Sequence, residues 1–219
     1  MAASHPLILG HRGLSSKHLE NSLEAFRAAL AAGMAGFELD VQPTRDGVCM
    51  VLHDEDLTRT ANGSGLLRKM KVAELPPLKN GEPLPRLADV LELPAKLINV
   101  ELKGEPGWQQ ALATVEAAEA LDRVLFSSFE HSEVLQLWAA CETARCGFLW
   151  ETDEAMELTS EELADLPEAL WLHPPLKAVK AKPELWAPYA ERLALWGMKS
   201  PAEAKDLPFA PAVLIADGI

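Results

Sequence analysis

The sequence has little positive charge and few cysteines, which argues against several large classes of protein. Its 219 residues include 20 basic and 33 acidic side chains, and this formal net charge of -13 opposes docking on a nucleic-acid backbone or an anionic membrane surface. A small anionic substrate is still allowed, because a bound metal ion reverses the local field. The three cysteines, Cys49, Cys141 and Cys146, show no C-x-x-C spacing, so we expect structural thiols in a reducing compartment.

Long apolar runs and leader-like segments are also missing. No stretch approaches the ~20 apolar residues that cross a bilayer. The first predicted strand begins near Pro6, with neither a basic nor an apolar leader region before it. We therefore expect a soluble cytoplasmic protein without stable membrane anchoring. Apolar residues (48%) and charged residues (24%) are near the globular average, and the length suits one domain, residues 1–219, with a substantial core.

Four apolar segments deliver ionisable residues at their C-terminal ends. Gly36 to Val41 alternates apolar and acidic residues, so Glu38 and Asp40 share one face of a strand. Three similar segments are residues 6–10 before His11 and Arg12, residues 48–52 before His53, and residues 97–100 before Glu101 and Lys103. Such a set of strands indicates one site at the C-terminal edge of a barrel or an open α/β sheet.

The order of the predicted elements is that of an α/β barrel. A helix capped by Asn21 and ended by Gly33 separates the first two strands as a βαβ unit. The Asp46-Gly47 turn predicts a hairpin-like strand ending at His53. Apart from that strand, eight are expected, over residues 6–10, 36–41, 97–103, 124–129, 145–150, 170–173, 192–196 and 213–217. Helices expected between them include residues 108–121 and 176–189. We predict a TIM (β/α)8 barrel whose last outer helix is missing.

Two segments depart from this rhythm. Residues 54–85 contain Asn62-Gly63-Ser64-Gly65, interpreted as a flexible turn, and a proline-rich end, so we expect a small subdomain inserted after the second barrel strand near the mouth. The stretch 151–168 holds eight carboxylates and no basic residue. A solvated helical face is the simpler interpretation, and a second metal site is the alternative.

Three carboxylates, Glu38, Asp40 and Glu101, are expected close together at strand ends. Like charges repel at such distances, so the cluster needs a hard divalent cation. Oxygen ligands favour Mg²⁺ or Ca²⁺ over zinc. His11 and His53, at other strand ends, can act as general acid and base near neutral pH.

Further residues can bind or position a substrate. Arg12 and Lys103 supply positive charge for a phosphate, and this combination with a metal and two histidines describes phosphodiester cleavage. Asp54 is interpreted as fixing the turn at His53. Glu20 either starts the helix or orients His11. Aromatic residues expected at strand ends, where they could pack on a substrate, are Trp150, Trp196 and Phe129.

The motifs resemble, in order and spacing, those of the glycerophosphodiester phosphodiesterase family: His11-Arg12-Gly13, Glu20-Asn21-Ser22, Glu38-Leu39-Asp40-Val41, Asp46-Gly47, His53-Asp54 and Glu101-Leu102-Lys103. The resemblance spans residues 7–103. It implies a TIM barrel with an insertion after the second strand. It also implies that the three carboxylates bind the metal, the two histidines act as acid and base, and Arg12 and Lys103 hold the phosphate. The implied reaction releases glycerol 3-phosphate and an alcohol through a cyclic phosphate, in glycerophospholipid breakdown.

The resemblance has departures that leave alternatives open. The family usually has proline at the position of Leu19, and it tends to show Trp-Thr and Thr-Asp where this chain has Trp196-Gly197 and Ala216-Asp217. A missing last helix leaves apolar surface for the first helix or a second subunit to cover, so a homodimer is one expectation. The alternative functions are a lysophospholipase D-like phosphodiesterase and a catalytically silent barrel that binds phosphodiesters.

Overall fold

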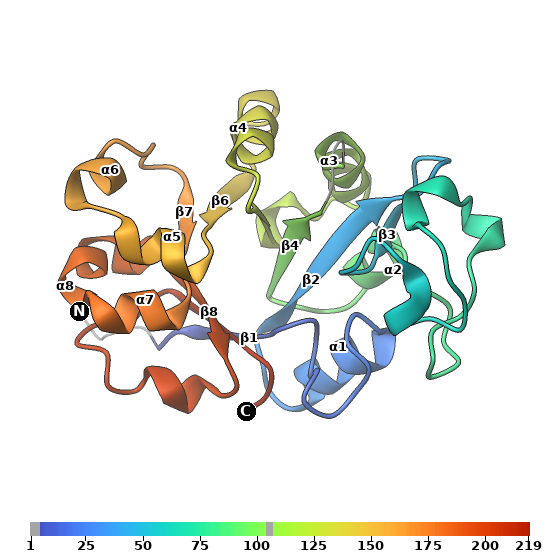
Figure 1. The fold of residues 1–219 in the computed structure, drawn as a ribbon, viewed down its shortest axis with the longest axis horizontal. Coiled ribbons are helices and arrows are strands. Elements are labelled where there is room, and N and C mark those ends of the chain that lie inside the picture. Colours follow the sequence, from blue (N-terminus) through green and yellow to red (C-terminus); the bar gives the residue numbers. More distant parts are fainter. Residues whose placement is uncertain (1–4, 104–106) are drawn as a thin grey trace.

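The structure is a computed structural model that describes residues 5–103 and 107–219 (Figure 1). Residues 1–4, on which the expectation of no leader segment partly rests, and residues 104–106 lie outside the described part. The strands of the described part are β1 (Leu7–Gly10), β2 (Gly36–Pro43), β3 (Cys49–Val51), β4 (Leu97–Leu102), β5 (Val124–Ser128), β6 (Arg145–Leu149), β7 (Trp171–His173), β8 (Ala194–Met198) and β9 (Val213–Ala216).

Eight of these strands form the wall of a barrel. They run in the order β7-β6-β5-β4-β2-β1-β9-β8, and neighbours along this sheet are parallel. The two end strands approach through the parallel bridges Leu172–Leu193 and Pro175–Trp196, so the barrel is nearly closed. β3 lies outside this path and pairs antiparallel with β2, as expected of the hairpin. The predicted TIM barrel is confirmed.

Helices carry the connections around the barrel (Figure 1). The α-helices are α1 (Leu23–Ala31), α2 (Leu87–Leu91), α3 (Trp108–Ala117), α4 (His131–Ala140), α5 (Thr152–Glu157), α6 (Ser160–Ala164), α7 (Leu176–Ala181) and α8 (Pro183–Trp186). The 3-10 helices are η1 (Leu57–Arg59), η2 (Leu67–Lys69), η3 (Val72–Glu74), η4 (Leu121–Arg123), η5 (Ala187–Arg192) and η6 (Pro201–Ala204).

Two predicted helices are shorter than the sequence indicated. The one expected over residues 176–189 is divided into α7, α8 and η5, because Pro183 and Pro188 have no N–H to donate within a continuous helix. The one expected over residues 108–121 ends at Ala117, and Glu119 follows with a left-handed backbone (φ 51°) that cannot continue the helix.

The predicted cap of α1 is wrong by one residue. Ser22 is the N-cap, and its hydroxyl accepts a hydrogen bond from the backbone N–H of Ala25. Asn21 is buried in a left-handed conformation (φ 55°), and its side chain turns toward the barrel, where Nδ2 donates to Asp40 Oδ2 at 2.8 Å. Because the serine satisfies the helix terminus, the asparagine is free to hold a carboxylate of the site.

Alternation along the strands divides the core into two regions. On β2, Phe37, Leu39 and Val41 belong to the large cluster that packs beneath the helices. Glu38 and Asp40, which alternate with them, therefore face the inside of the barrel. The interior apolar cluster is small and consists of Leu9, Leu97, Leu125, Ala194, Val213 and Ile215. The space above it is left to polar side chains.

Residues 217–219, which follow β9, contain no helix. Part of the surface that such a helix covers is packed by the segment 201–211, whose Leu207 and Phe209 lie against the core cluster that contains Leu214. Leu214 is buried, while Ile8 of β1 is half-buried. A cavity of about 700 Å³ remains between this segment and the two strands.

Residues 54–85 contain η1, η2 and η3 and form a small core of their own. Leu57, Leu67 and Leu78 are almost fully buried there, together with Met50 and Leu52 from the hairpin. In Figure 1 this segment (teal) lies beyond β3 at the edge of the barrel. The apolar side chains of the segment are therefore used to attach it to the hairpin.

The acidic stretch 151–168 contains α5 and α6, and all eight of its carboxylate residues are exposed. Within residues 5–103 and 107–219, the one group of three or more potential metal ligands lies elsewhere, on β2 and β4. The stretch is thus a solvated face. No helix in the described residues combines the length and apolar character required to cross a membrane.

Candidate active site

Two neighbouring strands bring the three predicted carboxylates together inside the barrel. Asp40 of β2 and Glu101 of β4 are register partners, and Glu38 lies one inward position earlier on β2. The three residues can each offer one oxygen such that all lie within 4.8 Å of one another. Their side chains are buried, and Glu38 Oε1 and Asp40 Oδ1 have no hydrogen-bond partner in the described part of the chain, whereas Glu101 Oε1 faces the ammonium group of Lys103.

Electrostatics show why this cluster needs compensation. Burial, and then the charge of Asp40, raise the pKa of Glu38 to about 8 and that of Glu101 to about 7. Buried carboxylates with unpaired oxygens at this spacing suit a hard divalent cation that takes oxygen ligands, such as Mg²⁺ or Ca²⁺. The residues present therefore fit the metal that the sequence analysis expected.

The two predicted phosphate-binding cations lie against the same carboxylates. Lys103 Nζ is 2.5 Å from Glu101 Oε1 and 3.6 Å from Asp40 Oδ1. Arg12 Nε is 3.3 Å from Asp40 Oδ2, and the backbone N–H of Arg12 donates to Glu38 Oε2 at 2.9 Å. Arg12 adopts a left-handed backbone (φ 55°), which a non-glycine residue keeps only where surrounding contacts stabilise it.

Each of the two histidines is hydrogen-bonded through Nδ1 to its own aspartate. His11 Nδ1 lies 2.8 Å from Asp217 Oδ1, and His53 Nδ1 lies 2.7 Å from Asp54 Oδ1. Because a carboxylate only accepts, Nδ1 carries the proton and Nε2 is left to exchange a proton with a substrate. Burial alone lowers the pKa of His11, but the Asp217 hydrogen bond and the Glu38 charge raise it above its usual value.

The side chain of Gln42 holds the backbone turn that carries His53. The side-chain amide of Gln42 on β2 donates to the carbonyl oxygens of Leu52, His53 and Asp54 at 2.8–3.0 Å. Gln42 follows Asp40 by two residues, so it shares the inward face of β2. The strand that carries two metal-ligand candidates thus also fixes the position of His53.

A chain of ion pairs connects His53 with Arg12. Arg59 of η1 binds Asp54 and also binds Glu20, with Nη1–Oε2 and Nη2–Oε1 distances of 2.6 and 2.8 Å. Glu20 Oε1 in turn accepts from Arg12 Nη1 at 2.8 Å. Burial opposes ionisation of Glu20, but its bonds with Arg59 and Arg12 lower its pKa to about 2. Glu20 therefore orients Arg12, whereas Asp217 orients His11.

These groups surround one cavity of about 220 Å³ at the C-terminal ends of the strands. It is lined by His11, Arg12, Glu38, His53, Asn99, Glu101, Lys103, Ser127, Phe129, Leu149, Glu151, Trp196 and Ile215. Asp40 lies directly behind this lining, in contact with both Arg12 and Lys103. The structure thus brings both predicted histidines, both predicted cations and all three predicted carboxylates to one place.

Of the aromatic candidates, two line the cavity and one does not. Phe129 and Trp196 contact each other edge to face at a centroid distance of 5.8 Å, and the indole N–H of Trp196 donates to the His173 carbonyl at 2.9 Å. Trp150 packs against Phe148 and Trp186 in the outer core, so its predicted place at the mouth is wrong. It follows Leu149, which faces inward, and strand alternation turns Trp150 outward.

Comparison with known proteins agrees with this geometry. The family model described as the glycerophosphoryl diester phosphodiesterase family matches residues 11–191. The chain belongs to this family. The resemblance seen in the motifs is thereby confirmed, and the match extends beyond residue 103 into the second half of the barrel.

Individual members of the glycerophosphoryl diester phosphodiesterase family show similar agreement. A glycerophosphodiester phosphodiesterase from Caldanaerobacter subterraneus subsp. tengcongensis is 33% identical over 162 residues, which cover 66% of this chain and 67% of that protein. One from Bacillus altitudinis is 38% identical over 148 residues, 58% of this chain and 59% of that protein. The crystal structure of a Thermotoga maritima glycerophosphodiester phosphodiesterase, 29% identical, superposes with a TM-score of 0.78 and covers 98% of this chain and 95% of that one.

Three residues of this chain contact the predicted site residues or their partners, and the sequence did not predict these contacts. Asp217 binds His11 from the far end of the chain, Asn21 binds Asp40, and Arg59 binds Glu20 and Asp54. The position of Asp217 in the sequence does indicate a place in the site, because Asp217 stands at the C-terminal end of the last predicted strand, as His11 does at the end of the first. No local pattern distinguishes Arg59 from the other basic residues of the insertion.

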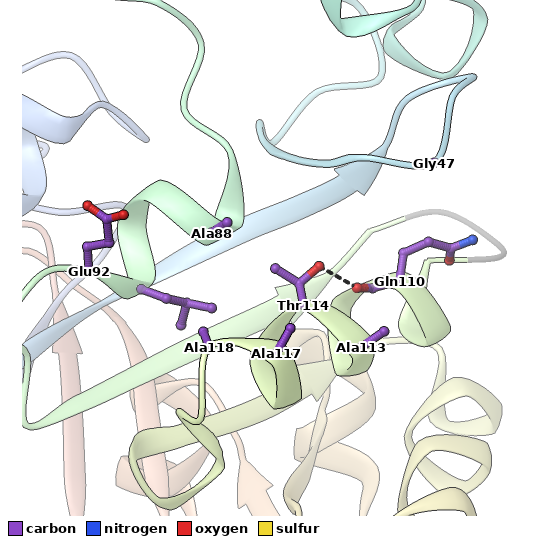
Figure 2. Close-up of a pocket in the computed structure, with 9 residues that line it drawn as sticks. Gly47, Ala88, Glu92, Gln110, Ala113, Thr114, Ala117 and Ala118 are labelled. Carbon is purple, nitrogen blue, oxygen red and sulfur yellow. Dashed lines mark hydrogen bonds between the residues drawn. The ribbon is translucent and has the colours of Figure 1, made fainter.

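A larger hollow of about 690 Å³ lies away from these groups. Figure 2 shows it between α2 and α3, with Ala88 and Glu92 on one side and Ala113, Thr114 and Ala117 on the other. The hydrogen bond drawn there, from Thr114 to the carbonyl of Gln110, lies within α3. Among the described residues, the hollow is lined mostly by small side chains, with no histidine and a single carboxylate, Glu92, so it is not the candidate active site.

Proposed function

We propose that this protein is a metal-dependent glycerophosphodiester phosphodiesterase, which hydrolyses glycerophosphodiesters to glycerol 3-phosphate and an alcohol in glycerophospholipid breakdown. The observation that carries the proposal is the convergence, in one small cavity, of a three-carboxylate cluster, two carboxylate-bound histidines and two fixed cations. Family membership and the names of its relatives support the same reaction.

The charged groups divide into two roles. Glu38, Asp40 and Glu101 would hold the divalent ion, Mg²⁺ or Ca²⁺, which when bound supplies positive charge for the phosphoryl oxygens. Arg12 and Lys103 bind the phosphodiester, because both side chains line the cavity and carry positively charged N–H donors. Glu20 and Asp40 keep Arg12 in position for this task.

The histidines account for the proton transfers. In the first step the glycerol 2-hydroxyl attacks phosphorus, one histidine takes its proton, and the other protonates the leaving alcohol oxygen. In the second step water opens the cyclic phosphate, the histidines exchange roles, and glycerol 3-phosphate is formed. Each histidine can serve in either direction, because its Nδ1 stays bound to a carboxylate while Nε2 gains or loses the proton.

The test is the release of glycerol 3-phosphate from glycerophosphocholine and glycerophosphoethanolamine, with Mg²⁺, with Ca²⁺ and with a chelator. We expect turnover that requires a metal and falls at least ~100-fold in the His11→Ala variant, as for loss of a general acid or base. His18→Ala is the matched control, since His18 contacts Glu24 outside the cavity. Product that appears regardless of the chelator or of His11 would contradict the proposed site.

The alternative functions are not favoured. Hydrolysis of lysophospholipids needs an apolar surface for an acyl chain, but the large exposed apolar side chains among the described residues are Leu135 and Ile219, both outside the cavity. Four leucines of the insertion, Leu57, Leu67, Leu78 and Leu84, are buried in its own core, and Leu75 packs against it. A silent barrel is opposed by the presence of both histidines and all three carboxylates.

We also propose a cytoplasmic location and a homodimer. The location is supported by the three free thiols, Cys49, Cys141 and Cys146, which suit a reducing compartment. The dimer would form over the apolar cavity beside β1 and β9, which is lined by Ile8, Leu207, Phe209 and Leu214 among others. Light scattering of the purified protein tests it, and a monomeric mass at micromolar concentration would contradict it.

A further inference from the structure

One carboxylate of the active-site cavity has no part in the reaction. Glu151 lies two residues beyond the end of β6 and lines the cavity together with Leu149, Phe129 and Trp196. In the described part of the chain, no Lys, Arg or His nitrogen lies within 4.0 Å of its oxygens. Apart from the hydroxyl of Ser127, the side chains that β5, β6, β8 and the residues after them present to the cavity are thus aromatic and aliphatic, with one exposed negative charge.

Apart from the two histidines, which are each paired with a carboxylate of their own, the other charges that meet at the phosphate balance one another when a substrate is bound. The three metal-ligand candidates and a phosphodiester carry four negative charges, and a divalent ion with Arg12 and Lys103 carries four positive ones. The negative charge of Glu151 is not compensated by any of these groups. A negative charge without a partner beside a phosphate weakens binding of the anion, so the cavity is complementary to a substrate that brings a cation of its own.

The neighbouring indole suits such a cation. Trp196 is held by its N–H bond to the His173 carbonyl and by its contact with Phe129, so the ring is fixed before a ligand arrives. Lys103 Nζ already lies 5.5 Å from the centroid of Phe129. Trp196 is half-buried and has no cation over it among the described residues. The face of an aromatic ring attracts ammonium groups, and the carboxylate of Glu151 lines the same cavity as this ring.

We propose that Glu151, Trp196 and Leu149 form a subsite for a positively charged substituent of the leaving alcohol. The ligand class is an ammonium or quaternary ammonium group linked to the phosphodiester by a short chain. Glu151 neutralises its charge, Trp196 contacts it through the face of the indole, and Leu149 limits access of water. The inference rests on the proposed function and adds a preference for cationic esters over neutral ones.

The test compares kcat/KM for glycerophosphocholine, a cationic ester, with that for glycerophosphoglycerol, a neutral one, in the wild type and in Glu151→Gln. We expect the variant to lose about fivefold toward glycerophosphocholine, the size expected of one partly exposed ion pair, and to keep its activity toward glycerophosphoglycerol. Glu157→Gln, on the exposed side of α5 and outside the cavity, is the matched control and should change neither value.

Binding measurements separate this inference from the proposed function. If the wild type cleaves neither ester, calorimetry with phosphocholine and propyl phosphate decides, and weaker binding of phosphocholine alone in Glu151→Gln supports the subsite. If Glu151→Gln leaves the ratio of the two kcat/KM values unchanged, the subsite is overturned and the proposed hydrolase activity still stands. Equal binding of phosphocholine by the variant and the wild type would overturn it as well.

Discussion

Arg59 and Glu20 form a two-point ion pair that joins the inserted segment to the loop after β1. Two nitrogens of the guanidinium contact two oxygens of the carboxylate, at 2.6 and 2.8 Å. Arg59 also donates through Nε to Asp54, and Glu20 also accepts a hydrogen bond from Arg12. One side chain of the insertion therefore positions a neighbour of His53 and, through Glu20, the arginine proposed to bind the phosphate.

Replacing Arg59 with alanine should lower the catalytic rate without unfolding the protein. Glu20 and Asp54 both lose their main partner, so Arg12 and His53 become less well oriented, and we expect kcat/KM to fall roughly 10- to 100-fold. Arg59→Lys should recover little of this, because an ammonium group cannot make two parallel bonds with a carboxylate. Arg68→Ala is the control, since Arg68 of the same segment pairs only with exposed Glu55. Equal activities of Arg59→Ala and Arg68→Ala would refute the positioning role.

Asp217 should matter to catalysis although it is distant from the motifs. In Asp217→Asn the side chain can offer its amide nitrogen instead of an oxygen to His11 Nδ1, which disturbs the tautomer that leaves Nε2 for the substrate. We expect kcat to fall roughly 10- to 100-fold, with a smaller change in KM, since Asp217 does not line the main cavity. Steady-state kinetics check this. An unchanged kcat would show that His11 does not need this partner.

Metal binding should stabilise the fold measurably. The cluster of Glu38, Asp40 and Glu101 exists in the folded barrel only, so an ion that binds there raises the free energy of unfolding by about 2.7 kcal/mol at a concentration 100 times its Kd. Thermal unfolding with Mg²⁺, with Ca²⁺ and with a chelator measures the effect. Glu101→Gln should remove most of the shift, and Glu157→Gln should keep it. A shift of equal size in Glu101→Gln would place the ion elsewhere.

His173 should make the protein sensitive to acid. Its ring is fully buried beside Gly147, both ring nitrogens lack a hydrogen-bond partner among the described residues, and burial lowers its pKa to about 3. The unfolded chain, with a pKa near 6.5, therefore binds a proton that the folded state rejects. The stability contributed by the neutral ring is complete above pH 6.5 and is lost as the pH falls toward 3.

Between pH 7 and pH 5 this effect should lower the free energy of unfolding by about 2 kcal/mol. Urea denaturation of the wild type and of His173→Leu, at both pH values, measures it as the difference between the two pH dependences. Leucine removes the titrating group and keeps an apolar side chain of moderate size in the same space. If both proteins lose the same stability over this range, the buried ring is not the acid-sensitive group.

Much of the site follows from local sequence patterns. Side chains alternate along a strand for steric reasons that depend on the strand alone, so Glu38 and Asp40 had to share a face, as did Glu101 and Lys103. Parallel strands end at one edge, and that rule placed His11 and Arg12 near them. The same local rules do not reveal which face of a later strand is inward, so they predict the same position at the mouth for Trp150 and Trp196.

Local patterns are enough to predict the barrel class, the metal-ligand candidates and both histidines, because strand alternation, turn residues and motif spacing act over a few residues. The groups that support these residues depend on the packing of distant segments. Asp217 reaches His11 across 206 positions, because β9 pairs with β1 when the sheet curls. Arg59 reaches Glu20 across 39 positions, because the inserted segment packs on the hairpin. Contacts of this kind depend on how distant elements pack, and no pattern within either segment contains that information.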